Sequence, residues 1–338
     1  MHNNTKSYVL GCGYAVFFSL AIPMLTSQAQ AAVNLRLGVP DPAQSSMGQA
    51  ANRFAELVEQ KTGGEVSFQV FPDGVLFSGD QNAAVNQLGS GALDGLILAS
   101  SVYASFEPRM NAISLPYLFS DYEQFQAYLN GEPGQELLSS LERLDIHGLG
   151  FFLRTFRNVT TRETPITTAE DFEDITLRTP NNPLFVSLFE TLGANPTPMT
   201  FSEVYSALQL KAIDGQENPV EVPYNNRFYE VQGHLNLTQH IADAFLLALS
   251  QSAWDRIPED YRDEVEQAAQ EMIDERNTQE IEQEQEIIAQ LKDEGMQVNS
   301  FAEGELEKVQ GIARAVYGQF SESIGEDFMQ KSLNFVTE

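Results

Sequence analysis

The chain has 338 residues, with 19 basic and 48 acidic side chains, a formal net charge of −29 and a single cysteine. This length allows two ordinary domains or one large one, and a hydrophobic content of 42% can build a core, which excludes wholesale disorder. The acidic excess excludes a general nucleic-acid binder and disfavours anionic lipid surfaces, because both need clustered Lys and Arg. The simplest interpretation of the acidity is a solvated, self-repelling surface suited to salty surroundings.

Residues 1–31 are predicted to be a cleavable export signal. Lys6 is followed by an apolar stretch from Tyr8 to Leu25, and Ala29-Gln30-Ala31 has the small-x-small pattern of a signal peptidase site. We predict cleavage after Ala31. Glycines and a proline interrupt the apolar stretch, which suits a removable signal better than the alternative, a retained anchor. Beyond this stretch no window approaches 18 apolar residues, so we expect no direct membrane insertion of the mature chain.

The single cysteine, Cys12, lies inside the predicted signal. Val9-Leu10-Gly11-Cys12 faintly resembles a lipoprotein cleavage site, and lipidation stays open as an alternative. After cleavage at Ala31 the mature chain has no cysteine, so neither a disulfide nor a thiol nucleophile is expected. It keeps 18 basic and 48 acidic residues and a net charge of −30.

Strand and helix patterns alternate along the mature chain. In residues 47–61 apolar side chains recur every three to four positions until Gly63-Gly64, as in a helix, whereas residues 66–71 alternate as in a strand. Alternation with short connections predicts an α/β fold with mostly parallel sheets. Strands are expected at residues 34–39, 66–71, 93–98, 147–153, 175–178 and 213–216, and helices at 47–61, 81–88, 183–192 and 201–210.

A longer helix is predicted from Pro258 to Glu294. Pro258 and the acids after it are typical of a helix start, and Gly295 ends the pattern. Its 37 residues make a rod of roughly 55 Å at about 1.5 Å per residue, which is long enough to span two domains. With 14 acids against three bases, its outer face is expected to be solvated. An irregular apolar stripe leaves a coiled-coil partner as the alternative.

The sequence carries no catalytic signature. His147, His234 and His240 form no metal-binding pattern, and no nucleophile elbow, phosphate-binding loop or dinucleotide fingerprint is present. No enzyme activity, cofactor or metal site is therefore predicted.

The few basic residues point to an anion site. Arg154, Arg157, Arg162 and Arg178 fall within 25 residues of a chain that is poor in arginine. Arg178 ends a predicted strand, and open α/β sheets bind ligands at the carboxyl ends of their strands. A guanidinium matches a carboxylate with two parallel hydrogen bonds. The alternative for Arg178 is a surface salt bridge.

Two motifs resolve the class of protein. Residues 196–209 have the sequence P-T-P-M-T-F-S-E-V-Y-S-A-L-Q, and residues 214–219 have D-G-Q-E-N-P. Together, at this spacing, they resemble the signature of the DctP-type solute-binding proteins of tripartite ATP-independent periplasmic (TRAP) transporters. Weaker similarity extends over the whole chain.

The resemblance implies a two-lobed α/β clamshell, with crossing strands and a long helix spanning both lobes. Lobe I is expected to contain residues 32–156 plus 243–282, and lobe II residues 157–242 plus 283–338.

The resemblance also implies how a ligand is held. Arg178 forms a two-pronged bridge to a carboxylate, Asn218 hydrogen-bonds the same group, Arg157 is a second cationic contact and Phe201 packs on the ligand body. Lobe I is expected to supply polar contacts to the distal end. The candidates there are Asp80, Gln81, Gln44, Ser45 and Ser46.

The expected function is that of a monomeric periplasmic protein that captures a small organic acid and delivers it to the integral-membrane subunits of a TRAP transporter. C4-dicarboxylates and sugar acids such as uronates lead the expected ligands, and ectoine ranks last. The alternatives are a ligand sensor that presents its closed form to a receptor and an exported α/β enzyme.

Overall fold

The computed structural model describes residues 1–8, 11 and 32–337. The segment from Ala32 onward forms one compact unit, separate from the N-terminal residues. The apolar stretch of the predicted export signal, Cys12 and the cleavage position after Ala31 lie outside the described residues. Within the described part of the chain, no helix combines the length and apolar character that a membrane crossing requires.

Nine strands from residues 32–337 form one mixed sheet. Their order is β2-β1-β3-β8-β4-β7-β5-β6, and β9 pairs separately with β8. The strands are β1 (Val33–Gly38), β2 (Val66–Phe71), β3 (Gly95–Ala99), β4 (Ile146–Thr161), β5 (Thr176–Thr179), β6 (Asn195–Pro198), β7 (Gly215–Asn218), β8 (His234–Ser250) and β9 (Gln297–Asn299).

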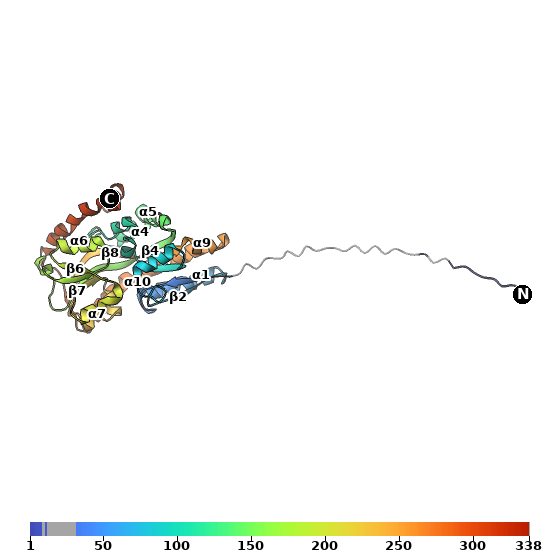
Figure 1. Ribbon diagram of the computed structural model, residues 1–338, viewed down its shortest axis with the longest axis horizontal. Coiled ribbons are helices and arrows are strands. Elements are labelled where there is room, and N and C mark those ends of the chain that lie inside the picture. Colours follow the sequence, from blue (N-terminus) through green and yellow to red (C-terminus); the bar gives the residue numbers. More distant parts are fainter. Residues whose placement is uncertain (9–10, 12–31, 338) are drawn as a thin grey trace. The chain divides into compact units, whose positions relative to one another are not determined.

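Two long antiparallel strands, β4 and β8, connect the two halves of the sheet (Figure 1). In one half β8 pairs with β3, and in the other β4 pairs with β7 while β8 pairs with β9. The β4–β8 register shifts between Arg154 and Arg157 and again between Arg157 and Val159. Such irregularities bend and twist a strand pair, so the two arginines lie where the crossing strands are locally irregular.

Helices cover both faces of the sheet (Figure 1). Because successive strand residues point to opposite faces, Leu246 and Ala248 enter one core cluster and Phe245 and Leu247 the other. The α-helices are α1 (Ser46–Lys61), α2 (Gln81–Gly89), α3 (Ser100–Tyr103), α4 (Tyr122–Asn130), α5 (Glu132–Ser140), α6 (Pro183–Thr191), α7 (Val204–Gln209), α8 (Glu221–Asn225), α9 (Gln251–Arg256), α10 (Arg262–Asp293), α11 (Glu305–Ala313), α12 (Tyr317–Ile324) and α13 (Glu326–Phe335).

The long helix α10 has 32 residues and packs against α1, β4 and α8. At about 1.5 Å per residue it is roughly 48 Å long. Its first half buries an apolar stripe, but its middle buries Arg276, Asn277, Glu280 and Glu284 instead. Arg276 donates to Glu280 at 2.5 Å, so this buried charge is paired within the helix. The middle of α10 is therefore held by polar contacts where it packs against the crossing strand β4.

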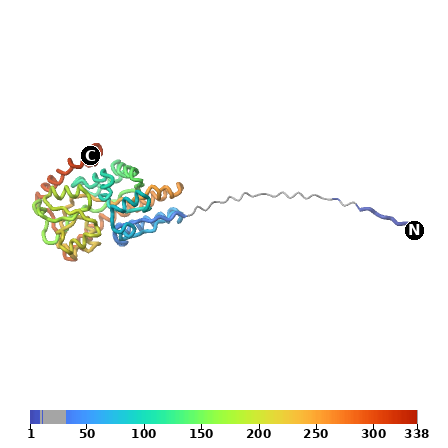
Figure 2. Tube along the Cα trace, viewed as in Figure 1, coloured from blue at the N-terminus to red at the C-terminus, as the bar shows by residue number. Residues whose placement is uncertain are grey.

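The C-terminal helices return to an earlier part of the chain. Tyr128 and Ser332 share a buried hydrogen bond of 2.8 Å, and the Lys331 ammonium lies 2.6 Å from the Glu136 carboxylate. Figure 2 shows this red segment ending beside the green one that contains α5. The C-terminal helix α13 thus packs against α4 and α5.

The predicted α/β fold with a long helix is confirmed, but the expectation of mostly parallel sheets is wrong for the centre. Each outer part of the sheet is parallel, whereas the crossing strands are antiparallel. The strand predicted at 147–153 continues to Thr161, and the strand at His234–Ser250 was not predicted. The additional part of β4, residues 154–161, and the strand β8 both contain buried polar residues, which interrupt the hydrophobic pattern.

A first prediction concerns the contact between α10 and β4. The Asn277 side-chain oxygen accepts a 2.8 Å hydrogen bond from the Leu153 amide, and both residues are buried. Asn277→Leu leaves that amide without a partner, so the free energy of unfolding should fall by about 1–3 kcal/mol. Urea denaturation measures this change. Thr278→Val, at the exposed neighbouring position, is the matched control and should change stability little; an equal effect of both variants would contradict the assignment.

Candidate functional site

Arg178 lies on β5, between β6 and β7, with its side chain 4% exposed. Its Nε and Nη2 atoms donate to the Met199 carbonyl at 3.1 and 2.8 Å. Both Nη1 hydrogens and the second Nη2 hydrogen have no partner within residues 32–337. The Phe201 ring lies 5.9 Å from the guanidinium carbon. The backbone contact therefore fixes the guanidinium and leaves its outer edge free.

Arg178 is buried without an ion pair to any residue in the described part of the chain. Burial lowers its pKa to about 10; the charge of Glu217 opposes this effect and that of Arg157 adds to it. In a chain with such an acidic excess, a buried arginine that lacks an acid is a notable exception. It is a positive charge that lacks a counter-ion.

Arg154 and Arg157 are instead neutralised by ion pairs with acids. Arg157 Nη2 lies 2.8 Å from a Glu217 carboxylate oxygen, and its Nη1 also pairs with Asp243. Arg154 donates to Glu221 at 2.7 Å and to Asp243 at 2.8 Å. Burial opposes the charged form of both arginines, but the ion pairs outweigh it and raise both pKa values. Asp243 thus joins the two arginines at the register shifts of the crossing strands.

Asn218 and His240 extend this network. Asn218 accepts from Arg157 Nη2 at 3.0 Å and donates to Gln216 at 2.6 Å. A ring nitrogen of His240 lies 3.1 Å from Glu217, and burial lowers the pKa of His240 although Glu217 opposes the shift. These contacts hold the Asn218 amide beside Arg157, and its second amide hydrogen has no partner within residues 32–337.

Two small adjoining cavities, of about 40 and 30 Å³, meet at Arg178. A single water needs about 10–15 Å³ of such space, so each cavity has room for only a few water-sized groups. Both halves of the sheet contribute to the walls. The residues lining both cavities are Gln81, Ser101, Val102, Arg178, Pro180 and Phe201, and the larger cavity adds, among others, Asp41, Met47, Arg154, Arg157, Asn218 and Phe245.

The structure brings Arg178, Arg157, Asn218, Phe201 and Gln81 together in the larger cavity. The other lobe I candidates are placed differently. Asp80 lines the smaller cavity but also caps α2, accepting from Ala83 at 3.0 Å.

Gln44, Ser45 and Ser46 do not line either cavity. The Ser45 hydroxyl caps α1 by accepting from Gly48 at 3.1 Å, and Ser46 contacts Arg276 at 2.8 Å and Glu280. Gln44 is exposed.

Asp41 and Arg154 are cavity residues that the sequence did not single out as ligand contacts. Asp41 could have been found from the sequence, because it follows the carboxyl end of β1. Open α/β sheets bind ligands at the carboxyl ends of their strands, which was also the reason for selecting Arg178. For Arg154 the sequence showed only a cluster of arginines. Its side-chain partners lie 67 and 89 residues away along the chain.

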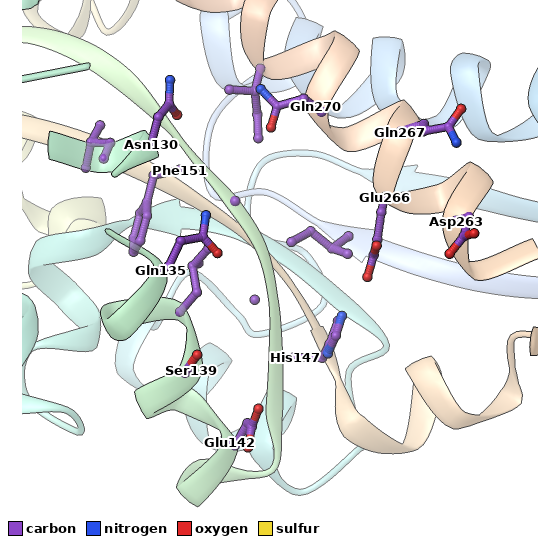
Figure 3. A pocket seen from close by; sticks show the side chains of 16 residues that line it. Asn130, Gln135, Ser139, Glu142, His147, Phe151, Asp263, Glu266, Gln267 and Gln270 are labelled. Carbon is purple, nitrogen blue, oxygen red and sulfur yellow. The ribbon is translucent and has the colours of Figure 1, made fainter. Parts of the chain in front are cut away.

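A surface depression of about 530 Å³ lies elsewhere, between α5, the start of β4 and the start of α10 (Figure 3). Its wall contains Glu142, Asp263 and Glu266 but neither lysine nor arginine, so it cannot neutralise a carboxylate. His147 in this wall stacks on Trp254 at 4.0 Å, and burial lowers its pKa. Among the described residues, no group of three or more His, Cys, Asp or Glu side chains is arranged to hold a metal ion.

A two-lobed α/β fold with an unpaired cation in its cleft defines a solute-binding protein. The chain belongs to the bacterial extracellular solute-binding proteins, family 7 (DctP), whose family model matches residues 38–323. This family consists of substrate-binding transport proteins rather than enzymes, as the sequence predicted.

Relatives and solved structures agree with this assignment. The chain is 31% identical over 285 residues to the 2,3-diketo-L-gulonate-binding periplasmic protein YiaO of Escherichia coli, covering 84% of this chain and 86% of that one. It superposes with a TM-score of 0.87 on the sugar acid binding protein DctPAm of Advenella mimigardefordensis in complex with galactonate, at 29% identity over 91% of this chain and 98% of that one. A TRAP periplasmic solute-binding protein of Sulfurospirillum deleyianum with bound succinate gives a TM-score of 0.84 at 27% identity, over 90% and 99% of the two chains.

The second prediction tests the buried network through Asp243, which is fully buried between Arg154 and Arg157. Asp243→Asn removes the shared negative charge, and breaking a buried ion pair on one side costs about 3–5 kcal/mol. The midpoint of urea unfolding should fall accordingly with an unchanged slope.

The matched control is Glu170→Gln, which removes an acid from an exposed pair with Lys308. Exposed pairs contribute little, so the control should unfold close to the unmodified protein. If Asp243→Asn were no more destabilising than this control, the network would not hold the crossing strands together.

Proposed function

We propose that this protein is a periplasmic component of a TRAP transporter that captures a small organic acid, either a C4-dicarboxylate or a sugar acid, and delivers it to integral-membrane subunits. The observation that carries the proposal is Arg178, a buried guanidinium with free donors and no acid partner within residues 32–337. The names of the relatives support the periplasmic location, as does the predicted export signal.

A carboxylate is the group that this arrangement fits. Moving an anion out of water is unfavourable unless its charge is neutralised and its lone pairs accept hydrogen bonds. The Nη1 and Nη2 edge of Arg178 offers two parallel donors for that purpose. The ligand supplies the missing counter-ion, and its binding removes the unfavourable burial of an unpaired charge.

The remaining candidates have supporting roles in this proposal. Asn218 donates its free amide hydrogen to the same carboxylate, and Phe201 packs on the ligand body. Arg157 already contacts Glu217, Asp243 and Asn218, so its cationic contribution to the ligand comes through one remaining Nη1 hydrogen and through the position of Asn218. Of the lobe I candidates, Gln81 and Asp80 have the stronger support because they line the cavities, whereas Gln44, Ser45 and Ser46 do not.

The net charge of −29 does not conflict with an anionic ligand. At about 0.5 M salt the Debye length is only about 4 Å, so the surface acids have little influence on an approaching anion. Once the ligand is inside the cleft, the unpaired guanidinium determines the local potential.

We also propose that the two lobes move about the crossing strands. The division is residues 32–156 plus 243–282 for lobe I and 157–242 plus 283–338 for lobe II, with the change of lobe in β4 at Arg154–Arg157. The register shifts at these residues support a hinge there.

The third prediction is that Arg178 dominates affinity. Removing one partner of a buried charged pair costs about 3–5 kcal/mol, which corresponds to a loss of several hundred-fold or more. Isothermal calorimetry with galactonate and succinate should show binding to the unmodified protein and almost none to Arg178→Ala, with the circular dichroism spectrum unchanged.

The control for that experiment is Arg256→Ala, which removes a half-exposed arginine far from the cleft lining. It should bind as the unmodified protein does. An unchanged dissociation constant in Arg178→Ala would overturn the role assigned to this residue.

The fourth prediction concerns closure. Because the ligand contacts both lobes, binding shifts an open ensemble toward a closed one. Small-angle X-ray scattering should give a smaller radius of gyration at saturating ligand than without it. Identical scattering curves, recorded with a ligand whose binding calorimetry has established, would indicate a rigid binder.

A further inference from the structure

Asp41 is an acid in the wall of the cavity that contains Arg178, the guanidinium to which the proposed function assigns the ligand carboxylate. It lies between Pro40 and Pro42, just after the carboxyl end of β1, and lines the same cavity as Arg178. Its side chain is partly buried, and its carboxylate forms no hydrogen bond with any residue in 32–337. An acceptor facing a cavity without a partner is a site for a donor from the ligand.

The surroundings of Asp41 disfavour its charge. Burial raises the pKa of Asp41 to about 6; Arg154 opposes that shift, and Glu221 and Asp73 add to it. The carboxylate therefore gains from any donor that approaches it, but a second anion there is repelled.

Arg154 supplies donors to the same cavity. Its Nε and Nη2 donate to Glu221 and its Nη1 donates to Asp243, so the side chain is neutralised. Each Nη atom carries two hydrogens, which leaves one on each without a partner among the described residues. The guanidinium lies 4.3 Å over the Phe245 ring, which fixes its plane.

We propose that Asp41 and Arg154 form a hydroxyl subsite, and that the ligand is a polyhydroxylated monocarboxylate, a sugar acid rather than a C4-dicarboxylate. This inference rests on the proposed function, with the ligand carboxylate at Arg178. A hydroxyl both donates and accepts, so it can donate to Asp41 while accepting from Arg154. Gln81 and Ser101 add further polar groups, and Leu98 and Val102 present apolar surface to the carbon chain.

Other distal groups satisfy only part of this site. A second carboxylate cannot donate to Asp41, and the positive charge of Arg154 is already shared between Glu221 and Asp243. An ammonium donates to Asp41 but cannot accept from Arg154. An alkyl chain leaves both polar groups desolvated and unpaired, which is unfavourable.

The experiment is calorimetry of the unmodified protein and Asp41→Ala with four acids: galactonate, succinate, hexanoate and 4-aminobutanoate. The unmodified protein should bind galactonate most tightly. Asp41→Ala should weaken galactonate about tenfold or more, as expected for a hydrogen bond to a charged group. Succinate binding should stay the same or tighten, because a repelling carboxylate has been removed.

Asp73→Asn is the matched control, because it removes a neighbouring acid that raises the pKa of Asp41 but does not line the cavity. Asparagine tolerates the positive φ of 58° at this position. This variant should keep the preference for galactonate.

Three outcomes would overturn the subsite. The first is tighter binding of succinate than galactonate by the unmodified protein, the second is equal weakening of all four acids by Asp41→Ala, and the third is a preference for 4-aminobutanoate that Asp41→Ala abolishes. Failure of the proposed function is distinguishable, because then Arg178→Ala would not affect binding or no acid would bind at all.

Discussion

The structure depends on how buried arginines are neutralised. Two of the three arginines in the cleft wall, Arg154 and Arg157, are paired with Glu221, Glu217 and Asp243. The third, Arg178, is held by a backbone carbonyl and has no acid partner in residues 32–337. Since burying an unpaired charge is unfavourable, Arg178 is an unsatisfied cation within the described part of the chain. That unsatisfied charge is what supports the proposed carboxylate site.

The fold positions this charge through its crossing strands. Arg154 and Arg157 lie where the β4–β8 register shifts, and Asp243 on β8 joins them. Helix α10 packs across the same region and contacts the backbone of β4 through Asn277. The network that joins the crossing strands therefore also lines the cavity that contains Arg178, where we propose that the ligand binds.

Much of the fold could be predicted from the sequence, because hydrophobic patterns mark β1, β2, β3, β5, α1 and α10. The short strands β6 and β9 carry no such pattern and were not predicted. The crossing strands were predicted only in part, since their buried polar residues resemble loops until their partners are known. Arg178 was singled out from the sequence because arginine is scarce and strand ends bind ligands, and the structure places it in a cavity wall. The pairing of Arg157 with Glu217 could not be found, because 48 acids offer too many possible partners. Asp41 also follows the carboxyl end of a strand, but the sequence alone did not distinguish it from the many other acids.

The most direct test of the account is a crystal structure of the protein with galactonate bound. The account predicts that both oxygens of the ligand carboxylate lie within hydrogen-bonding distance of the Arg178 guanidinium, at about 2.7–2.9 Å, while Arg154 and Arg157 keep their acid partners. A carboxylate bound to Arg154 or Arg157 with Arg178 left unpaired, or a ligand seated in the depression beside α5, would contradict it.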